Sequence, residues 1–167
     1  ARAADIETIK ATKATLNPGA ELVTADLEVT VDDPSVVRGK RVLVIEDGPT
    51  VTHGGMGYGA GWVAAQQCGA KEMIDPRAFA VGTIGDVYKA HPQLLAVLPA
   101  MGYSPDQRRA LKATIEASGA ELVLNGSPAD IAGLLDLTVP TVQVRYRFVA
   151  KEGVDLLARA RTLLSGQ

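Results

Sequence analysis

Arg41-Val-Leu-Val-Ile-Glu46, an apolar run, and Thr52-His-Gly-Gly-Met-Gly-Tyr-Gly-Ala-Gly61, which follows it, decide the fold of this chain. Five glycines fall between positions 54 and 61. Glycine costs backbone entropy, so such a loop is typical of a chain that needs φ > 0 or lets another group approach closely. Residues 60–69 (AGWVAAQQCG) predict a helix of small and apolar residues, whose first turn has unpaired N–H groups and a positive dipole end. Strand, glycine loop and helix together predict a phosphate-binding site.

The rest of the chain after residue 40 alternates predicted strands with predicted helices. Several strands are continuous apolar runs, such as VLVI and LVL, which is typical of strands buried on both faces. Strands that alternate with helices predict a parallel sheet covered by helices. The expected fold is therefore α/β, with three α/β/α layers and a mostly parallel, Rossmann-like sheet of about five strands. The predicted strands are residues 41–46, 72–75, 94–98, 121–124 and 141–148, and the predicted helices are residues 60–69, 83–90, 104–118, 129–137 and 153–164.

The N-terminal segment has a different pattern. Residues 4–16 predict a helix that Asn17-Pro18-Gly19 ends, and residues 20–25 predict a short strand. Residues 26–40 indicate a connector with an edge strand at most. We place a domain boundary in this connector. Residues 1–32 would be the end of a preceding domain plus the connector, and residues 33–167 would form a C-terminal Rossmann-like domain.

Composition excludes several classes of protein. Apolar residues make up 47% and charged residues 22% of the 167 positions, as in globular domains. A net charge of −2 and 4% aromatic residues lack the signature of a nucleic-acid-binding protein. No apolar run approaches the roughly 20 residues that cross a bilayer, so no membrane partner is expected. The single cysteine, Cys68, cannot form an intrachain disulfide and no signal peptide opens the chain, which predicts a cytoplasmic protein.

Candidate site residues follow the predicted strands, because ligands of open α/β sheets bind beyond the carboxyl ends of strands. Glu46 and Asp47 either hold Mg²⁺ through water or orient a ligand hydroxyl, or they are solvated turn residues. His53 either contacts a phosphate or moves a proton, or it bonds to carbonyls of the loop. Asp75-Pro-Arg77 is a ligand clamp or an ordinary turn. His53, Glu46 and Asp47 are the predicted catalytic residues. The predicted phosphate- and substrate-binding residues are Thr50, Thr52, Gly54, Gly55, Gly57, Tyr58, Gly59, Asp75, Arg77, Tyr103 and Ser127.

The glycine loop matches no named phosphate motif well. Gly39-Lys40 is the only Gly-Lys pair and is followed by arginine, so there is no P-loop. Residues 55–60 fit the relaxed dinucleotide pattern, and Asp75 falls 20 positions after Gly55. However, eight residues separate Glu46 from Gly55, whereas that fingerprint begins where the strand ends, so we treat NAD binding as a chance match. No metal-spaced histidine pair or catalytic-triad order is present, and no metal site is predicted.

Residues 39–61 (GKRVLVIEDGPTVTHGGMGYGAG) resemble the C-terminal region of the cyclic 2,3-diphosphoglycerate synthetase family and its bacterial relatives described as predicted GTPases. Similar blocks follow in the same order at residues 70–77 (AKEMIDPR), 81–82 (VG), 98–104 (LPAMGYS) and 142–146 (VQVRY). The resemblance covers essentially the whole chain. Synthetases of this family use ATP to close an intramolecular phosphoanhydride in 2,3-diphosphoglycerate.

The resemblance implies a larger protein whose earlier part carries a P-loop. Residues 4–25 would then be the last helix and strand of that NTPase domain. ATP or GTP with Mg²⁺ would be bound mainly there, and this chain would hold a phosphorylated small molecule. The chain lacks the P-loop, the metal-binding acid strand and the Asn-Lys-x-Asp segment of the family pattern, so catalysis by it alone is not expected.

Two functions from different classes follow. In the first, this chain is the substrate-binding domain of a nucleotide-dependent synthetase-like protein, with its own NTPase domain as partner and homo-oligomerisation as an option. In the second, it is a regulatory or interaction module whose glycine loop docks on the NTPase domain or another subunit. Met56, Tyr58 and Trp62 favour the second, because apolar and aromatic side chains suit a packed interface.

Overall fold

A computed structural model describes residues 3–102, 104–151 and 154–165 of the chain. The chain divides into two compact units. The larger unit comprises residues 29–146, and the smaller unit comprises residues 1–28 together with 147–167. None of the helices in the described ranges has both the length and the apolar character that a membrane crossing requires.

The larger unit is built on a five-stranded sheet of β2 (Arg41–Asp47), β3 (Glu72–Met73), β4 (Leu98–Ala100), β5 (Leu122–Asn125) and β6 (Thr141–Gln143). β2 lies in the centre, with β5 and then β6 on one side. On the other side β3 pairs with the start of β2 and β4 pairs with its end, where Ile45 faces Leu98. All of these pairings are parallel, so the carboxyl ends of the strands lie at one edge.

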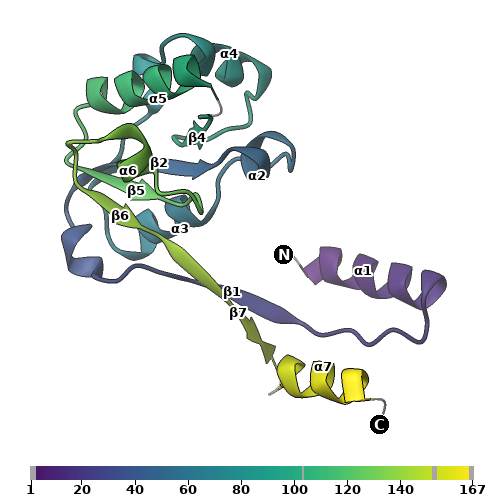
Figure 1. The fold of residues 1–167 in the computed structure, drawn as a ribbon. Helices are drawn as coiled ribbons and strands as arrows, with labels where there is room; N and C mark the ends of the chain where they lie inside the picture. Colours follow the sequence, from purple (N-terminus) through teal and green to yellow (C-terminus); the bar gives the residue numbers. More distant parts are fainter. Residues whose placement is uncertain (1–2, 103, 152–153, 166–167) are drawn as a thin grey trace. The chain divides into compact units, whose positions relative to one another are not determined.

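Helices cover both faces of this sheet. Figure 1 shows α3 on one face and α4 and α5 on the other, which gives the predicted three-layer α/β/α arrangement. The predicted fold class is thereby confirmed. The helical elements of the larger unit are α2 (Gly48–Thr52), α3 (Ala60–Gln67), α4 (Thr83–Ala90), α5 (Pro105–Ala117) and α6 (Ile131–Leu135), with 3-10 helices η1 (Pro34–Val36) and η2 (Pro76–Phe79).

The apolar sequence of the central strand, β2, follows from its burial. Val42, Leu43, Val44 and Ile45 are all fully buried, so successive side chains on both faces of β2 are apolar. The N-terminus of α5 forms as its residues predict. Ser104 and Gln107 form a reciprocal capping box, in which each side chain accepts a hydrogen bond from the other residue's amide.

Several predicted boundaries are wrong for identifiable reasons. The predicted strand at residues 94–98 begins only at Leu98, because Leu94 and Val97 are buried in a connecting segment. The predicted strand at residues 141–148 is divided into β6 and β7 (Arg145–Ala150). α2 was not predicted, since it is short and lies where a loop was expected.

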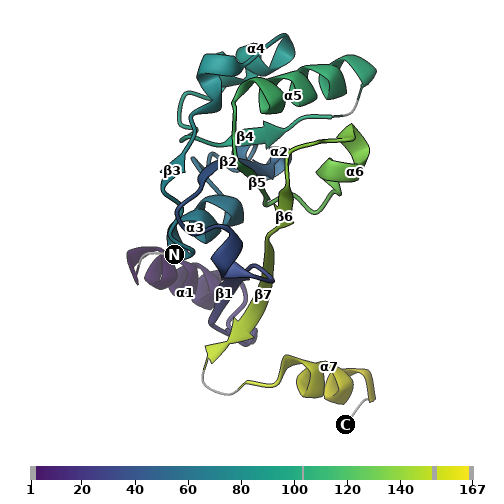
Figure 2. The same cartoon turned by 90° about the vertical axis from the view of Figure 1, so that its left-hand side faces the viewer.

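The smaller unit contains α1 (Ala3–Leu16) and α7 (Leu156–Ser165), and the division between the units falls within β1 (Ala25–Thr30) and β7. β1 begins at Ala25, the last residue of the predicted strand at 20–25, and lies otherwise in the predicted connector. Figure 2 shows β1 and β7 side by side, as a two-stranded sheet. This pairing groups residues 147–167 with the N-terminal segment, unlike the predicted domain of residues 33–167. Whether residues 1–32 belong to an NTPase domain stays a prediction.

Candidate functional site

The carboxylate of Glu46 fills the first turn of α3. Its Oε1 accepts hydrogen bonds from the amides of Gly59 at 3.0 Å and Trp62 at 2.8 Å, and its Oε2 accepts one from Gly61 at 3.3 Å. The helix N-terminus that was predicted to hold a phosphate therefore already holds an anion from the chain itself. We call residues 59–62 the inner turn.

Close packing around Glu46 explains the glycines of the inner turn. A Cβ atom on Gly59 would lie 2.5 Å from Glu46 Oε2, and one on Gly126 would lie 2.6 Å from the same oxygen. A Cβ atom on Gly61 would lie 2.8 Å from Val44. These positions need glycine because the protein approaches them, which replaces the ligand-based reason for Gly59 and Gly61. Gly126 was not among the predicted residues, because a single glycine after β5 carries no distinctive pattern.

Burial raises the pKa of the Glu46 carboxyl, and the nearby charge of Asp47 adds to this, while the amides of Trp62, Gly61 and Gly59 oppose the rise in pKa. Only 2% of Glu46 is exposed, and both of its oxygens accept hydrogen bonds. The predicted role of Glu46 in holding Mg²⁺ does not fit this donor set, because no oxygen is left facing solvent. Within the described residues, no three His, Cys, Asp or Glu side chains group as metal ligands.

Asp47, Thr50 and Thr52 organise α2. Asp47 Oδ2 accepts hydrogen bonds from the Thr50 amide at 3.3 Å and the Thr50 hydroxyl at 2.8 Å, so Asp47 is the N-cap of α2. The Thr52 hydroxyl donates to the Gly48 carbonyl at 2.7 Å and lies 3.2 Å from Nδ1 of His53. The imidazole of His53 is exposed at the end of this helix, beside the glycine segment.

Residues 54–58, which we call the outer loop, differ from the inner turn. Within the described part of the chain, the amides of residues 55–58 donate no hydrogen bond to another protein group. Gly55 has a φ of +65°. The Gly57 carbonyl accepts a hydrogen bond from the Leu95 amide at 2.8 Å, and a Cβ on Gly57 would lie 2.7 Å from the Gln93 carbonyl. The outer loop is thus fastened on its carbonyl side, while these amides are open to a ligand.

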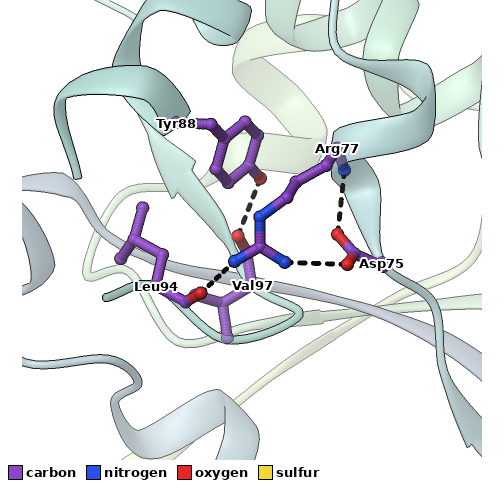
Figure 3. Close-up of polar contacts among 5 residues, drawn as sticks. All are labelled: Asp75, Arg77, Tyr88, Leu94 and Val97. Carbon is purple, nitrogen blue, oxygen red and sulfur yellow. Dashed lines mark hydrogen bonds and ion pairs between the residues drawn. The ribbon is translucent and has the colours of Figure 1, made fainter. Parts of the chain in front are cut away.

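Figure 3 shows that Arg77 lies between Asp75, Tyr88 and Leu94. Its guanidinium pairs with Asp75 at 2.7 Å, donates to the Leu94 carbonyl and lies 5.3 Å from the centre of the Tyr88 ring. The Tyr88 hydroxyl donates to the Val97 carbonyl at 2.8 Å, and burial raises the pKa of that hydroxyl. Asp75 and Arg77 therefore hold the segment that precedes β4.

One peptide group links Arg77 to the outer loop. The Leu94 carbonyl accepts from Arg77, and the Leu95 amide of the same peptide group donates to Gly57. Arg77 is therefore a positioning residue for the outer loop in this structure. A ligand clamp formed by Asp75 and Arg77 has no support in these contacts, since the guanidinium is already engaged.

Ser127 belongs to a separate network at the ends of β5 and β6. Its hydroxyl accepts a hydrogen bond from the Ala129 amide at 3.2 Å, and its amide donates to Asn125 Oδ1 at 3.0 Å. Asn125 also donates to Gln143 Oε1 at 2.8 Å. The structure does not bring Ser127 into contact with the outer loop through these bonds. Of the remaining predicted residues, Gly54 follows α2 in the outer loop, and Tyr103 lies outside the described residues.

Comparison with known proteins gives one similarity that bears on function. No family model matches the chain, and no solved structure gives a match. The chain is 47% identical over 142 residues to a protein named arginine synthetase ArcE from Thermococcus kodakarensis. The matched region covers 85% of this chain and 32% of that protein, so the chain spans about a third of its relative's length. This chain is therefore similar to part of a synthetase, and the comparison does not single out the cyclic 2,3-diphosphoglycerate synthetase family.

Proposed function

We propose that this chain is a domain of a nucleotide-dependent synthetase, and that its outer loop binds an anionic group of the substrate or nucleotide. The observation that carries the proposal is the 47% identity to an arginine synthetase over 142 residues. By its name, that relative makes arginine. We propose a related ligase reaction for the longer protein to which this chain would belong.

The geometry of the outer loop supports anion binding. The amides of residues 55–58 are unengaged, and adjacent amides in a loop make a concave site for phosphate or carboxylate oxygens. The exposed His53 ring beside them offers a further donor. Glu46 and Asp47 lie at the start of the same segment, so their charges weaken the attraction of the site for a multiply charged anion. We therefore expect weak binding to this chain alone.

The similarity to an arginine synthetase and the resemblance to the cyclic 2,3-diphosphoglycerate synthetase family suggest two classes of substrate. The name of the relative favours arginine or a precursor that shares its amino-acid portion. The sequence blocks at residues 39–61 and 98–104 favour 2,3-diphosphoglycerate. Both classes carry a carboxylate, and a nucleotide-driven reaction on either involves phosphoryl groups. ATP or GTP with Mg²⁺ would be bound mainly by the rest of the longer protein, because Glu46 is fully engaged and Asp47 caps α2.

The test is a titration of the chain with arginine, inorganic phosphate and 2,3-diphosphoglycerate, followed by amide NMR spectra. We expect saturable shifts at residues 54–58, with the most effective ligand identifying the substrate class. His53→Ala should weaken binding about threefold to tenfold, corresponding to one hydrogen bond of typical net strength. His91→Ala is the matched control and should not change it. The proposed site would be wrong if none of the three ligands moved these amides.

The interaction module remains a second candidate because Met56 and Tyr58 are 46% and 42% exposed. The rings of Tyr58 in the outer loop and Trp62 in α3 lie with their centroids 6.3 Å apart, and a protein surface could cover this aromatic pair. Carbonyl groups of that surface would then satisfy the open amides. This candidate would be favoured if the longer protein protected the outer loop while none of the three ligands bound there.

A further inference from the structure

The two-stranded sheet of β1 and β7 has one charged face. Ion pairs join Asp26 to Lys151 at 3.0 Å and Glu28 to Arg147. Asp26 precedes Glu28 along β1, whereas their basic partners come in the reverse order, with Lys151 directly after β7 and Arg147 within it, so the strands are antiparallel. Every second side chain of a strand lies on the same face, and the four charged side chains of these two ion pairs are each partnered within the chain. The charged face therefore needs no other molecule.

The opposite face is apolar and uncovered. Alternation places Leu27 and Phe148 there, and they are 65% and 53% exposed. A shallow depression of about 440 Å³, open to solvent, adjoins Phe148. Ala150, Val154, Asp155 and Leu156 form the rest of its lining. We call the surface formed by Leu27, Phe148, Ala150, Val154 and Leu156 the apolar β1–β7 face.

The helices of the smaller unit have no core of their own. In their described residues, neither α1 nor α7 buries a side chain, although α7 carries Leu157 and Leu164 at 64% and 89% exposure. A sheet of two strands is marginal in water unless a third strand or a helix covers it. Helices of this length also depend on tertiary packing for most of their stability. The smaller unit therefore lacks the packing partner that would bury the apolar side chains of its sheet and helices.

We infer that the apolar β1–β7 face docks on the part of a longer synthetase polypeptide that this chain does not span. The inference rests on the domain assignment in the proposed function, and not on ligand binding by the outer loop. Its occupant follows from the relative, of which this chain matches only 32%. Because the charges on the other face are already paired, the contacting surface should be apolar, with few charged side chains at its centre.

The experiment compares this chain alone with a chimaera in which it replaces the matched region of the Thermococcus arginine synthetase. Amide hydrogen exchange is measured by mass spectrometry in peptides from β1, β7 and α7. We expect exchange about tenfold slower or more in the chimaera, because docking stabilises the hydrogen bonds of this layer. Phe148→Asp should abolish this protection. Val149→Asp, on the same strand and the charged face, is the matched control and should retain it.

Two results would overturn the inference. Equal exchange in both proteins, with β2 and α5 protected in each, would show that the rest of the polypeptide does not cover this face. Protection that appears in the chain alone as concentration rises, with a doubled mass in light scattering, would identify a second copy as the occupant. Anion titration of the outer loop is measured separately, so either proposal can fail while the other stands.

Discussion

The inner turn and the outer loop lie next to each other in one glycine-rich segment, yet their amides are used differently. The amides of Gly59, Gly61 and Trp62 bind the carboxylate of Glu46, whereas those of residues 55–58 bind no protein group in the described structure. The inner glycines let β2 approach α3, and Gly55 permits a positive φ. Glycine content therefore does not by itself distinguish amides that are already engaged from amides that are free. We propose that a ligand binds only where the chain provides no anion of its own.

The largest expected effect comes from removing the internal anion. Glu46→Ala should lower the free energy of unfolding by about 3 kcal/mol, because the amides of the inner turn lose their acceptor and a cavity forms. Asp47→Ala is the matched control and should lose only about 1 kcal/mol, as an N-cap does. Urea denaturation measures both. Equal losses would contradict a special role for Glu46.

The next largest effect is expected from replacing a glycine by alanine, and it should be greater beside Glu46 than in the outer loop. Gly126→Ala would place Cβ 2.6 Å from Glu46 Oε2 and 2.9 Å from the Gly61 nitrogen. We expect a loss of about 2 kcal/mol, as for overpacking of a close-packed interior. Gly55→Ala meets nothing within 4 Å and should cost only about 1 kcal/mol for its positive φ. A larger loss for Gly55→Ala in thermal or urea denaturation would reverse the comparison.

Arg77 tests how the outer loop is fastened. Arg77→Ala should lower the free energy of unfolding by about 1 kcal/mol, since the guanidinium is partly exposed to solvent. It should also speed amide exchange at Leu95, because the Leu94 carbonyl loses its donor. Arg77→Lys keeps the charge near Asp75 without the planar fork, so it should recover only part of both effects. Unchanged exchange at Leu95 would show that Arg77 does not support the loop.

The smallest effect is a dependence on pH. Because the folded pKa of Glu46 is raised above its ordinary value of 4.5, the folded state binds more protons than the unfolded state above that pH. The pH-dependent part of the contribution of Glu46 to stability is largest below pH 4.5 and is lost as the pH rises through the raised pKa. Glu46→Gln should remove this component from the unfolding free energy measured between pH 4 and pH 7. An identical slope in both proteins would contradict it.

The fold was largely predictable because continuous burial on both faces leaves a plain signal in β2 and β5. The N-terminus of α5 was predictable from local residues, since Ser104 and Gln107 form a capping box. β4 was placed too early, because Leu94 and Val97 are buried without belonging to a strand. Apolar character reports burial, and burial alone does not distinguish a strand from a fixed loop.

The site was less predictable because its decisive contacts join residues that are far apart in sequence. Glu46 accepts from Gly59, which follows it by 13 positions, and Gly126 approaches the same carboxylate from β5. Glutamate at the end of a buried strand looks the same in sequence whether it caps a helix or holds a cation. Asn125 and Gln143 pair across adjacent strands, and neither lies in a recognisable motif.

Amide hydrogen exchange at single residues tests the division of the glycine segment most directly. It is followed by NMR on this chain with and without inorganic phosphate. We expect the amides of Gly61 and Trp62 to exchange slowly and to be unaffected by phosphate, because Glu46 holds them. The amides of residues 55–58 should exchange fast and slow down when phosphate is present. Fast exchange at Gly61 and Trp62, with phosphate slowing them instead, would contradict the assignment of the internal anion and of the ligand site alike.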